Sequence, residues 1–334
     1  GSVRAADRFA GRRLVVELAS ADGDVKVQWR AMLGDGANYV RQRVVLTAAS
    51  RPLEANEVVA WDVAVTKGRV AGSVDGSPVV SGNMFFACEH PMSWSRVSDA
   101  ESPGGQARLQ CGYRVAVTRT TGDALAPSWV VGVVPEGQLR RGFLYYLERE
   151  RAQPYRPLLH YNNGSEIGCE YWQRARHGKP EEAERFRQRQ QQVWLENIDA
   201  FGRELVAGRG VTMDVFAHDF EWDDETTVWR FHGGYPDGFA PAREAAGRYG
   251  ASVGVWLSPA GGYPGRKARI ESGRRQGLEA NDKGLTLAGP RYYSRVRAAC
   301  TGMIREYGAG YFKFDGFGAG NNQPGAGSYA SDVE

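Results

Sequence analysis

The hydrophobic pattern of this 334-residue chain changes near Arg140, and that change restricts the possible fold more than any other feature. Before Arg140, short apolar runs alternate with turn sequences such as Gly34-Asp35-Gly36. After it, short apolar runs alternate with longer segments of helical period. The chain is also too long for one ordinary hydrophobic core. We therefore expect two domains, residues 1–150 and residues 151–334.

The runs of the first domain show no helical period, and glycine and aspartate separate them. Short strands at such spacing are typical of an antiparallel β-sandwich. The expected strands are 13–19, 25–32, 39–47, 57–65, 79–86, 110–118 and 128–134. Cys88, just after the run 79–86, and Cys111, in the run 110–118, could form a disulfide, although we favour buried free thiols. The four cysteines form no CxxC pair, which argues against a zinc cluster.

In the second domain, apolar runs at 158–162, 211–216, 252–257 and 311–314 alternate with helical segments at 181–207, 241–249, 266–277 and 290–307. This alternation predicts right-handed βαβ units and therefore parallel strands. A parallel barrel closes with eight strands. We expect the first four βα units of a (β/α)8 TIM barrel, and so a fragment of a longer protein. An open, doubly wound sheet of four strands is the structural alternative.

In a barrel the active site is built where the strands end. Here the strand ends carry carboxylates, amides and aromatics, in the sequences His160-Tyr161-Asn162, His218-Asp219-Phe220-Glu221-Trp222, Trp256-Leu257-Ser258-Pro259 and Lys313-Phe314-Asp315. Carboxylates bind sugar hydroxyls, aromatic faces cover the apolar side of the ring, and one carboxylate can attack the anomeric carbon.

Lys313 and Asp315 alternate with phenylalanines, so both polar side chains face the same way. The lysine would keep the aspartate ionised, as a nucleophile must be. A structural ion pair at a strand end is the alternative interpretation.

Several functional classes are disfavoured. The net charge of +3 is small and the charges are interspersed, which argues against nucleic-acid binding. There is no apolar run long enough for a membrane span. His218, Asp219 and Glu221 match no strong metal-ligand spacing, so we expect no metal site. We expect that the protein can form oligomers, and a periplasmic or extracellular location is favoured.

The segment Tyr311-Phe312-Lys313-Phe314-Asp315 resembles the fourth-strand motif of the melibiase-type clan, glycoside hydrolase families 27, 31 and 36. Further segments resemble a bacterial family-36-like α-galactosidase and α-N-acetylgalactosaminidase group: 82–85, 89–93, 135–143, 157–163, 254–259 and 313–316. The resemblance implies a β-supersandwich followed by a (β/α)8 barrel.

By this resemblance, Asp315 is the catalytic nucleophile of a retaining exo-α-glycosidase. The enzyme would hydrolyse terminal α-galactosyl or α-N-acetylgalactosaminyl residues of oligosaccharides or glycoconjugates through a covalent glycosyl-enzyme, without a cofactor. The acid/base carboxyl would lie beyond Glu334, so we expect the chain alone to be inactive. The expected substrate-binding residues are Lys313, Asp219, Trp222, Trp256, Asn162 and Glu221.

Three positions depart from that group. It tends to have tryptophan where Gly164 and Ala260 stand, and a second aspartate where Phe220 stands. These differences leave the sugar and linkage open. Because of these differences, a catalytically inactive, carbohydrate-binding relative of the barrel is the alternative function. A metal-dependent barrel hydrolase is a further alternative.

Overall fold

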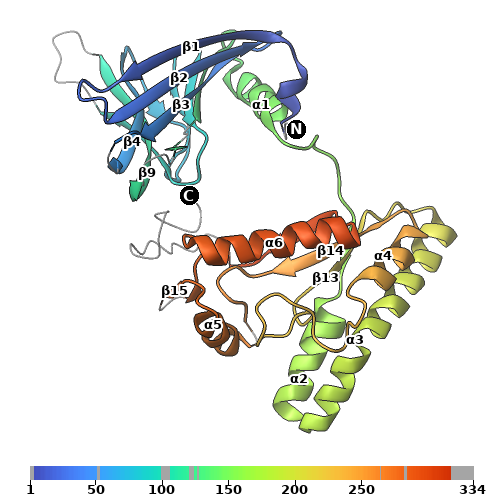
Figure 1. The fold of residues 1–334 in the computed structure, drawn as a ribbon. Coiled ribbons are helices and arrows are strands. Elements are labelled where there is room, and N and C mark those ends of the chain that lie inside the picture. Colours follow the sequence, from blue (N-terminus) through green and yellow to red (C-terminus); the bar gives the residue numbers. More distant parts are fainter. Residues whose placement is uncertain are drawn as a thin grey trace. The chain divides into compact units, whose positions relative to one another are not determined.

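The structure is a computed structural model that describes residues 4–50, 53–98, 106–119, 124–125, 128–263, 265–281 and 284–316. The chain divides into two compact units, and the boundary in the sequence lies between Arg156 and Pro157. The first unit is dominated by β-strands, and the second alternates strands and helices (Figure 1).

The first unit contains two antiparallel sheets. In the larger, β1-β2-β3-β11-β7-β6-β5 are consecutive neighbours and β10 pairs with β3; the smaller has the order β4-β9-β8. The strands are β1 (Gly11–Ala19), β2 (Val25–Gly34), β3 (Tyr39–Ala48), β4 (Leu53–Val65), β5 (Arg69–Val70), β6 (Val79–Ser81), β7 (Met84–Cys88), β8 (Ser93–Ser98), β9 (Ala107–Arg119), β10 (Ala124–Leu125) and β11 (Ser128–Val133).

The two sheets share one apolar layer. Val79 and Phe86 of the larger sheet pack with Leu109 and Cys111 of the smaller, and all four are buried. Burying the apolar face of each sheet against the other stabilises both. The antiparallel arrangement predicted from the sequence is confirmed.

The structure corrects the expectation for several elements of this unit. The expected strand 79–86 is two strands, β6 and β7, because Gly82 adopts a left-handed turn with φ of 56°. Strands β5, β8 and β10 and helix α1 (Leu139–Glu150) were not expected. Cys88 and Cys111 are free thiols, as favoured.

The second unit contains a sheet of four parallel strands in the order β12-β13-β14-β17. The strands are β12 (His160–Asn162), β13 (Val215–His218), β14 (Ser252–Leu257) and β17 (Tyr311–Phe314). The parallel arrangement is confirmed, whereas closure into a (β/α)8 barrel stays a prediction. Two further short strands, β15 (Ala280–Asn281) and β16 (Gly284–Leu285), form a separate pair.

Helices accompany these strands: η2 (Gly164–Cys169), α2 (Glu170–His177), α3 (Pro180–Phe201), η3 (Gly202–Ala207), α4 (Ala240–Gly247), α5 (Arg266–Arg275) and α6 (Pro290–Tyr307). In the first unit the short helix η1 (Ala5–Arg8) precedes β1. Helix α6 starts with Pro290, a residue favoured in the first turn because its missing N–H needs no partner there. It ends before Gly308, whose left-handed φ of 64° is easily adopted by glycine. No helix in the described part is both long and apolar enough to cross a lipid bilayer.

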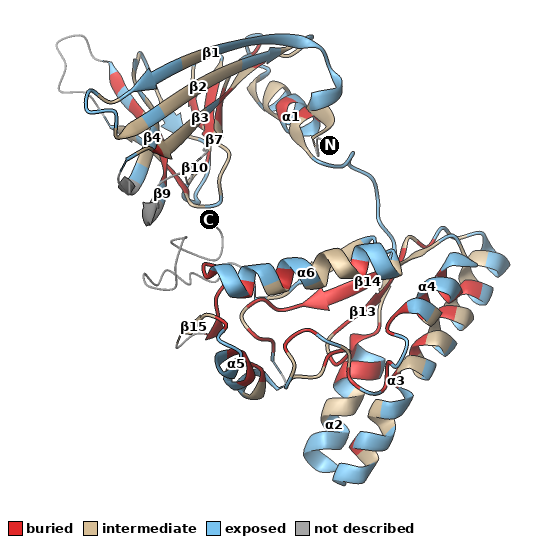
Figure 2. Ribbon diagram, viewed as in Figure 1, coloured by how far each residue is buried: buried red, intermediate tan, exposed pale blue. Residues whose placement is uncertain are grey.

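The centre of the second unit is apolar. All four residues of β13 and most of β14 are buried (Figure 2). Phe216, Val253 and Val255 of these strands pack with Tyr292 and Val296 of α6 in one cluster. This packing fixes the strands and thereby the positions of the residues that follow them.

The structure shifts one strand that matters for the site. Strand β13 covers Val215–His218 and not the expected 211–216, so His218 belongs to the strand and Asp219 is the first residue after it. The two π-helical segments η2 and η3 were also not expected.

Candidate functional site

Asp219 follows β13, and hydrogen bonds connect its carboxylate to side chains of β12 and β17. Asp219 is 4% exposed. Oδ2 accepts hydrogen bonds from Nζ of Lys313 at 2.8 Å and from Nδ2 of Asn162 at 2.7 Å. Oδ1 accepts one from the backbone amide of Phe220 at 2.9 Å. The structure thus brings together three of the expected site residues: Asn162 of β12, Asp219 directly after β13, and Lys313 of β17.

Lys313 lies between two carboxylates. Burial lowers the pKa of its ammonium, but the hydrogen bond to Asp219 and the charges of Asp219 and Asp315 raise that pKa further, and the net shift is upward. The side chain is 41% exposed, so the ammonium remains in contact with solvent. A charged donor at this position can bind a sugar hydroxyl.

Asp315 is held at three points. Its backbone amide donates to the carbonyl of Leu257 at 2.9 Å. The indole Nε1 of Trp256 donates to Oδ2 at 3.2 Å, and the hydroxyl of Tyr263 donates to Oδ1 at 2.9 Å. Each carboxylate oxygen therefore has a donor that fixes its orientation.

The sequence analysis missed Tyr263. It lies after β14, behind Gly261 and Gly262, whose φ angles of 111° and 79° are left-handed. The hydrogen bond to Asp315, followed by the charge of Asp315, raises the pKa of the Tyr263 hydroxyl. One feature of the sequence could have indicated Tyr263: an aromatic residue directly after the glycine pair Gly261-Gly262, in the loop that follows a strand.

The two expected aromatic residues are buried, and they do not form an open wall. Trp222 is 0% exposed, and its Nε1 donates to the backbone carbonyl of Trp256 at 2.8 Å. Trp256 is 1% exposed. In this arrangement Trp222 supports Trp256, and Trp256 orients Asp315.

Phe220 stands where a second carboxylate was expected from the resemblance. Its ring lies against Gly168 of η2, where an added Cβ would come within 2.6 Å of ring carbons. The ring also meets Trp256 edge to face, with centroids 6.0 Å apart. Near it, a Cβ on Gly164 would lie 3.0 Å from Oδ1 of Asn162 and 3.2 Å from Cγ of Asp219, so small residues are needed around this cluster.

Glu221 is buried, at 8% exposure, and its backbone is left-handed with φ of 77°. Burial, followed by the charges of Asp223 and Glu225, raises the pKa of its carboxyl to about 8. Within the described residues, no hydrogen bond joins Glu221 to Asp219 or Lys313. The structure therefore does not bring Glu221 into the Asp219 cluster.

His218 is fully buried, and both of its ring nitrogens contact oxygen atoms of the protein. Its Nδ1 lies 2.7 Å from the carbonyl oxygen of Asp219, and its Nε2 is hydrogen-bonded to the hydroxyl of Tyr235. Burial lowers the pKa of its imidazole to about 4, so it is neutral at pH 7. The residues that the structure describes contain no group of three or more potential metal ligands.

Comparison with known proteins identifies the fold. No sequence family matches the chain, and no curated protein matches it. Among solved structures, the GH36 α-galactosidase AgaA of Geobacillus stearothermophilus, in complex with 1-deoxygalactonojirimycin, aligns with 93% of this chain and 50% of its own at 12% identity, with a TM-score of 0.53. The fold of this chain is GH36-like.

Two further structures agree. The galactosidase domain of the α-galactosidase–sucrose kinase AgaSK aligns with 91% of this chain and 48% of its own, at 12% identity and a TM-score of 0.54. AgaA in complex with raffinose aligns with 91% and 49%, at 14% identity and a TM-score of 0.52. The chain spans about half the length of these relatives. At this identity the likeness concerns the fold alone.

Proposed function

We propose that this chain carries the nucleophile of a retaining exo-α-glycosidase that acts on terminal α-galactosyl or α-N-acetylgalactosaminyl residues. The proposal rests on one observation: hydrogen bonds hold the carboxylate of Asp315 in one orientation. Trp256 and Tyr263 each donate to one of its carboxylate oxygens, and Lys313 and Asp219 form an ion pair beside the same strand end. The GH36-like fold supports this choice, since the GH36 structures it resembles are α-galactosidases.

The proposed reaction has two steps. A carboxylate oxygen of Asp315 attacks the anomeric carbon while the glycosidic C–O bond breaks and a carboxylic acid protonates the leaving oxygen. Water then attacks the glycosyl-enzyme, gives a proton to that same carboxylate and releases Asp315. Asp219 is committed to Lys313, Asn162 and the Phe220 amide, so we propose that a different carboxyl group is the acid/base.

Substrate binding follows from the remaining groups. The Lys313 ammonium and the Asp219 carboxylate offer a donor and an acceptor for ring hydroxyls, and Asn162 holds Asp219 in place. Trp222 and Trp256 are both fully buried, so we propose that they support the substrate-binding residues from below and do not contact the sugar over an open face.

A second function is a carbohydrate-binding relative without hydrolytic activity. Phe220 favours it, because an aromatic ring packed on Gly168 occupies the position of the second carboxylate expected from the resemblance. Such a protein would bind galactosides without turning them over.

The stereochemical course of hydrolysis by the full-length protein tests the proposal. Proton NMR of the first product from an aryl α-galactoside or aryl α-N-acetylgalactosaminide should show the α-anomer. Asp315→Ala should lose several orders of magnitude of turnover and regain part of it with azide, as expected for a nucleophile. Glu204→Ala, an exposed control in η3 before β13, should retain activity. Release of the β-anomer, or retention of activity by Asp315→Ala, would refute the assignment.

A further inference from the structure

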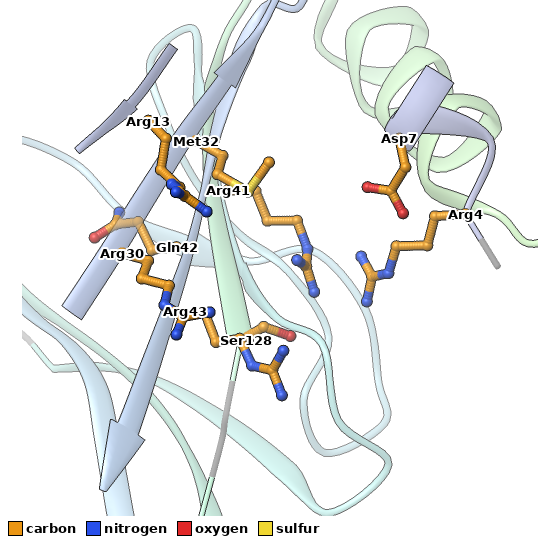
Figure 3. A pocket seen from close by; sticks show the side chains of 9 residues that line it. All are labelled: Arg4, Asp7, Arg13, Arg30, Met32, Arg41, Gln42, Arg43 and Ser128. Carbon is orange, nitrogen blue, oxygen red and sulfur yellow. The ribbon is translucent and has the colours of Figure 1, made fainter. Parts of the chain in front are cut away.

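A pocket of about 370 Å³ lies on the larger sheet of the first unit. Its lining is dominated by arginine side chains: Arg4, Arg13, Arg30, Arg41 and Arg43. In Figure 3, Arg41 from β3 and Arg4, which precedes η1, extend toward each other, with Asp7 beside Arg4. Met32, Gln42 and Ser128 complete the lining.

The strand register gathers these arginines on one face. Arg30 of β2 lies directly opposite Arg43 of β3, and Met32 lies opposite both Arg13 and Arg41. Residues two apart on a strand share a face, so the four arginines point to the same side of the sheet. Like charges directly opposite each other on neighbouring strands destabilise a sheet.

Carboxylates neutralise only part of this charge. Nε of Arg41 lies 2.6 Å from Oε2 of Glu89, and Nη1 of Arg4 lies 2.8 Å from Oε2 of Glu150. Within the described part of the chain, no ion pair with a carboxylate involves Arg13, Arg30 or Arg43.

The excess of positive charge also affects the pKa of Arg43. Burial lowers the pKa of its guanidinium, and the positive charges of Arg41, Arg30 and Arg4 lower it further. The sheet therefore holds like charges together with few compensating carboxylates, and a bound anion would supply the missing charge.

We propose that this pocket is a binding site for an oxyanion, a phosphate or sulfate group that is either free or attached to a sugar. Guanidinium groups bind such groups through paired N–H donors, and several converging arginines are their usual recognition chemistry. The volume is within the range of small-molecule sites. No aromatic side chain of the described residues lines the pocket, so the charged group and not a stacked ring is what it recognises.

The site is independent of the proposed glycosidase function. All of its residues belong to the first unit, and its occupation requires no turnover. Failure of either proposal would leave the other standing.

Isothermal titration of the 334-residue chain with inorganic phosphate at low ionic strength tests the inference. One saturable site is expected. The double variant Arg30→Gln/Arg43→Gln should bind at least about tenfold more weakly, because the central pair of donors is lost. A matched double control is Arg12→Gln/Arg69→Gln, which removes the same charge from exposed positions outside the pocket and should bind as the parent does.

The source of the anion is distinguished by parallel titrations with inorganic sulfate, glucose 6-phosphate and glucose. Tighter binding of glucose 6-phosphate than of phosphate assigns the site to a sugar-linked group, and equal affinities assign it to the free anion. Saturable binding of glucose alone would overturn the proposal, and so would equal phosphate affinities of the two double variants.

A thermal melt without added anion separates binding from a structural role. Arg30→Gln/Arg43→Gln relieves the cross-strand repulsion, so its Tm should equal or exceed that of the parent chain. A marked fall in Tm would show that these arginines stabilise the sheet themselves and would overturn the inference. Phosphate should raise the Tm of the parent chain through linkage, and the double variant should lack this rise.

Discussion

Nζ of Lys313 lies 2.8 Å from Oδ2 of Asp219, so β17 and β13 present paired charges at the same edge of the sheet although β14 separates them. Asp219 is 5% exposed at its side chain, and it would lose its countercharge in Lys313→Ala. We expect the free energy of unfolding to fall by about 1–2 kcal/mol, less than for a fully buried pair because Lys313 reaches solvent.

Chemical denaturation measures this change. Lys267→Ala, whose side chain is 92% exposed on α5, is the control and should change stability by less than about 0.5 kcal/mol. Equal effects of the two substitutions would show that the Lys313–Asp219 pair does not stabilise this edge.

Tyr263→Phe should weaken catalysis without preventing folding. The substitution removes the donor to Oδ1 of Asp315 and keeps the exposed ring. A lost hydrogen bond of this kind corresponds to a fall in kcat of about three- to tenfold. Tyr293→Phe, an exposed tyrosine on α6, is the control and should leave kcat unchanged.

Gly168→Ala should destabilise the second unit. The added methyl group would lie 2.6 Å from the ring of Phe220, so we expect a loss of about 1–3 kcal/mol in unfolding experiments. Gly247→Ala, in α4 with no atom within 4 Å of the added Cβ, should stabilise by about 0.5–1 kcal/mol. In the background of Phe220→Ala, the cost of Gly168→Ala should shrink, and additive costs would contradict the contact.

Glu221→Gln should change how stability depends on pH. The pKa of Glu221 rises from 4.5 to about 8 on folding. Between these values the folded state holds more protons than the unfolded state, so stability falls as pH rises from about 4.5 to about 8. Glutamine cannot ionise, so the variant should be more stable than the parent at pH 9 by a few kcal/mol.

Denaturation at pH 5 and pH 9 checks this result. The difference between parent and variant should be much smaller at pH 5, where Glu221 is still protonated in the folded state. His218, whose folded pKa is lowered to about 4, adds a slope of opposite sign below pH 6.5 that both proteins share. A pH-independent difference would show that Glu221 is ionised in the folded protein.

Sequence periodicity predicted the strands and helices that bury apolar residues. The expected ranges 252–257, 290–307 and 311–314 coincide with β14, α6 and β17, because alternation or a helical period is strong there. The expected range 211–216 ended before the polar His218, but His218 is buried within the strand, and β13 therefore runs from Val215, directly after Asp214, to His218.

The site was less predictable, because side-chain partners depend on contacts that no local pattern encodes. The sequence placed Lys313 and Asp315 on one face, but the hydrogen bond of Lys313 to Asp219 depends on the order of three strands. We expected Trp222 among the substrate-binding residues from its place after a strand, and the structure buries it fully. Tyr263 reaches Asp315 through a loop, where no periodicity exists to indicate direction.

The covalent intermediate provides the most direct test of the central claim. The full-length protein is incubated with an activated fluorosugar of the α-galactosyl or α-N-acetylgalactosaminyl series, digested and sequenced by mass spectrometry. The account predicts one glycosyl adduct per chain, on the peptide containing Phe314-Asp315-Gly316 and at Asp315 itself, and none in Asp315→Ala. An adduct on Asp219 or Glu221 would contradict the assignment of the nucleophile. An enzyme that hydrolyses the aryl glycoside yet never forms an adduct would contradict the retaining mechanism.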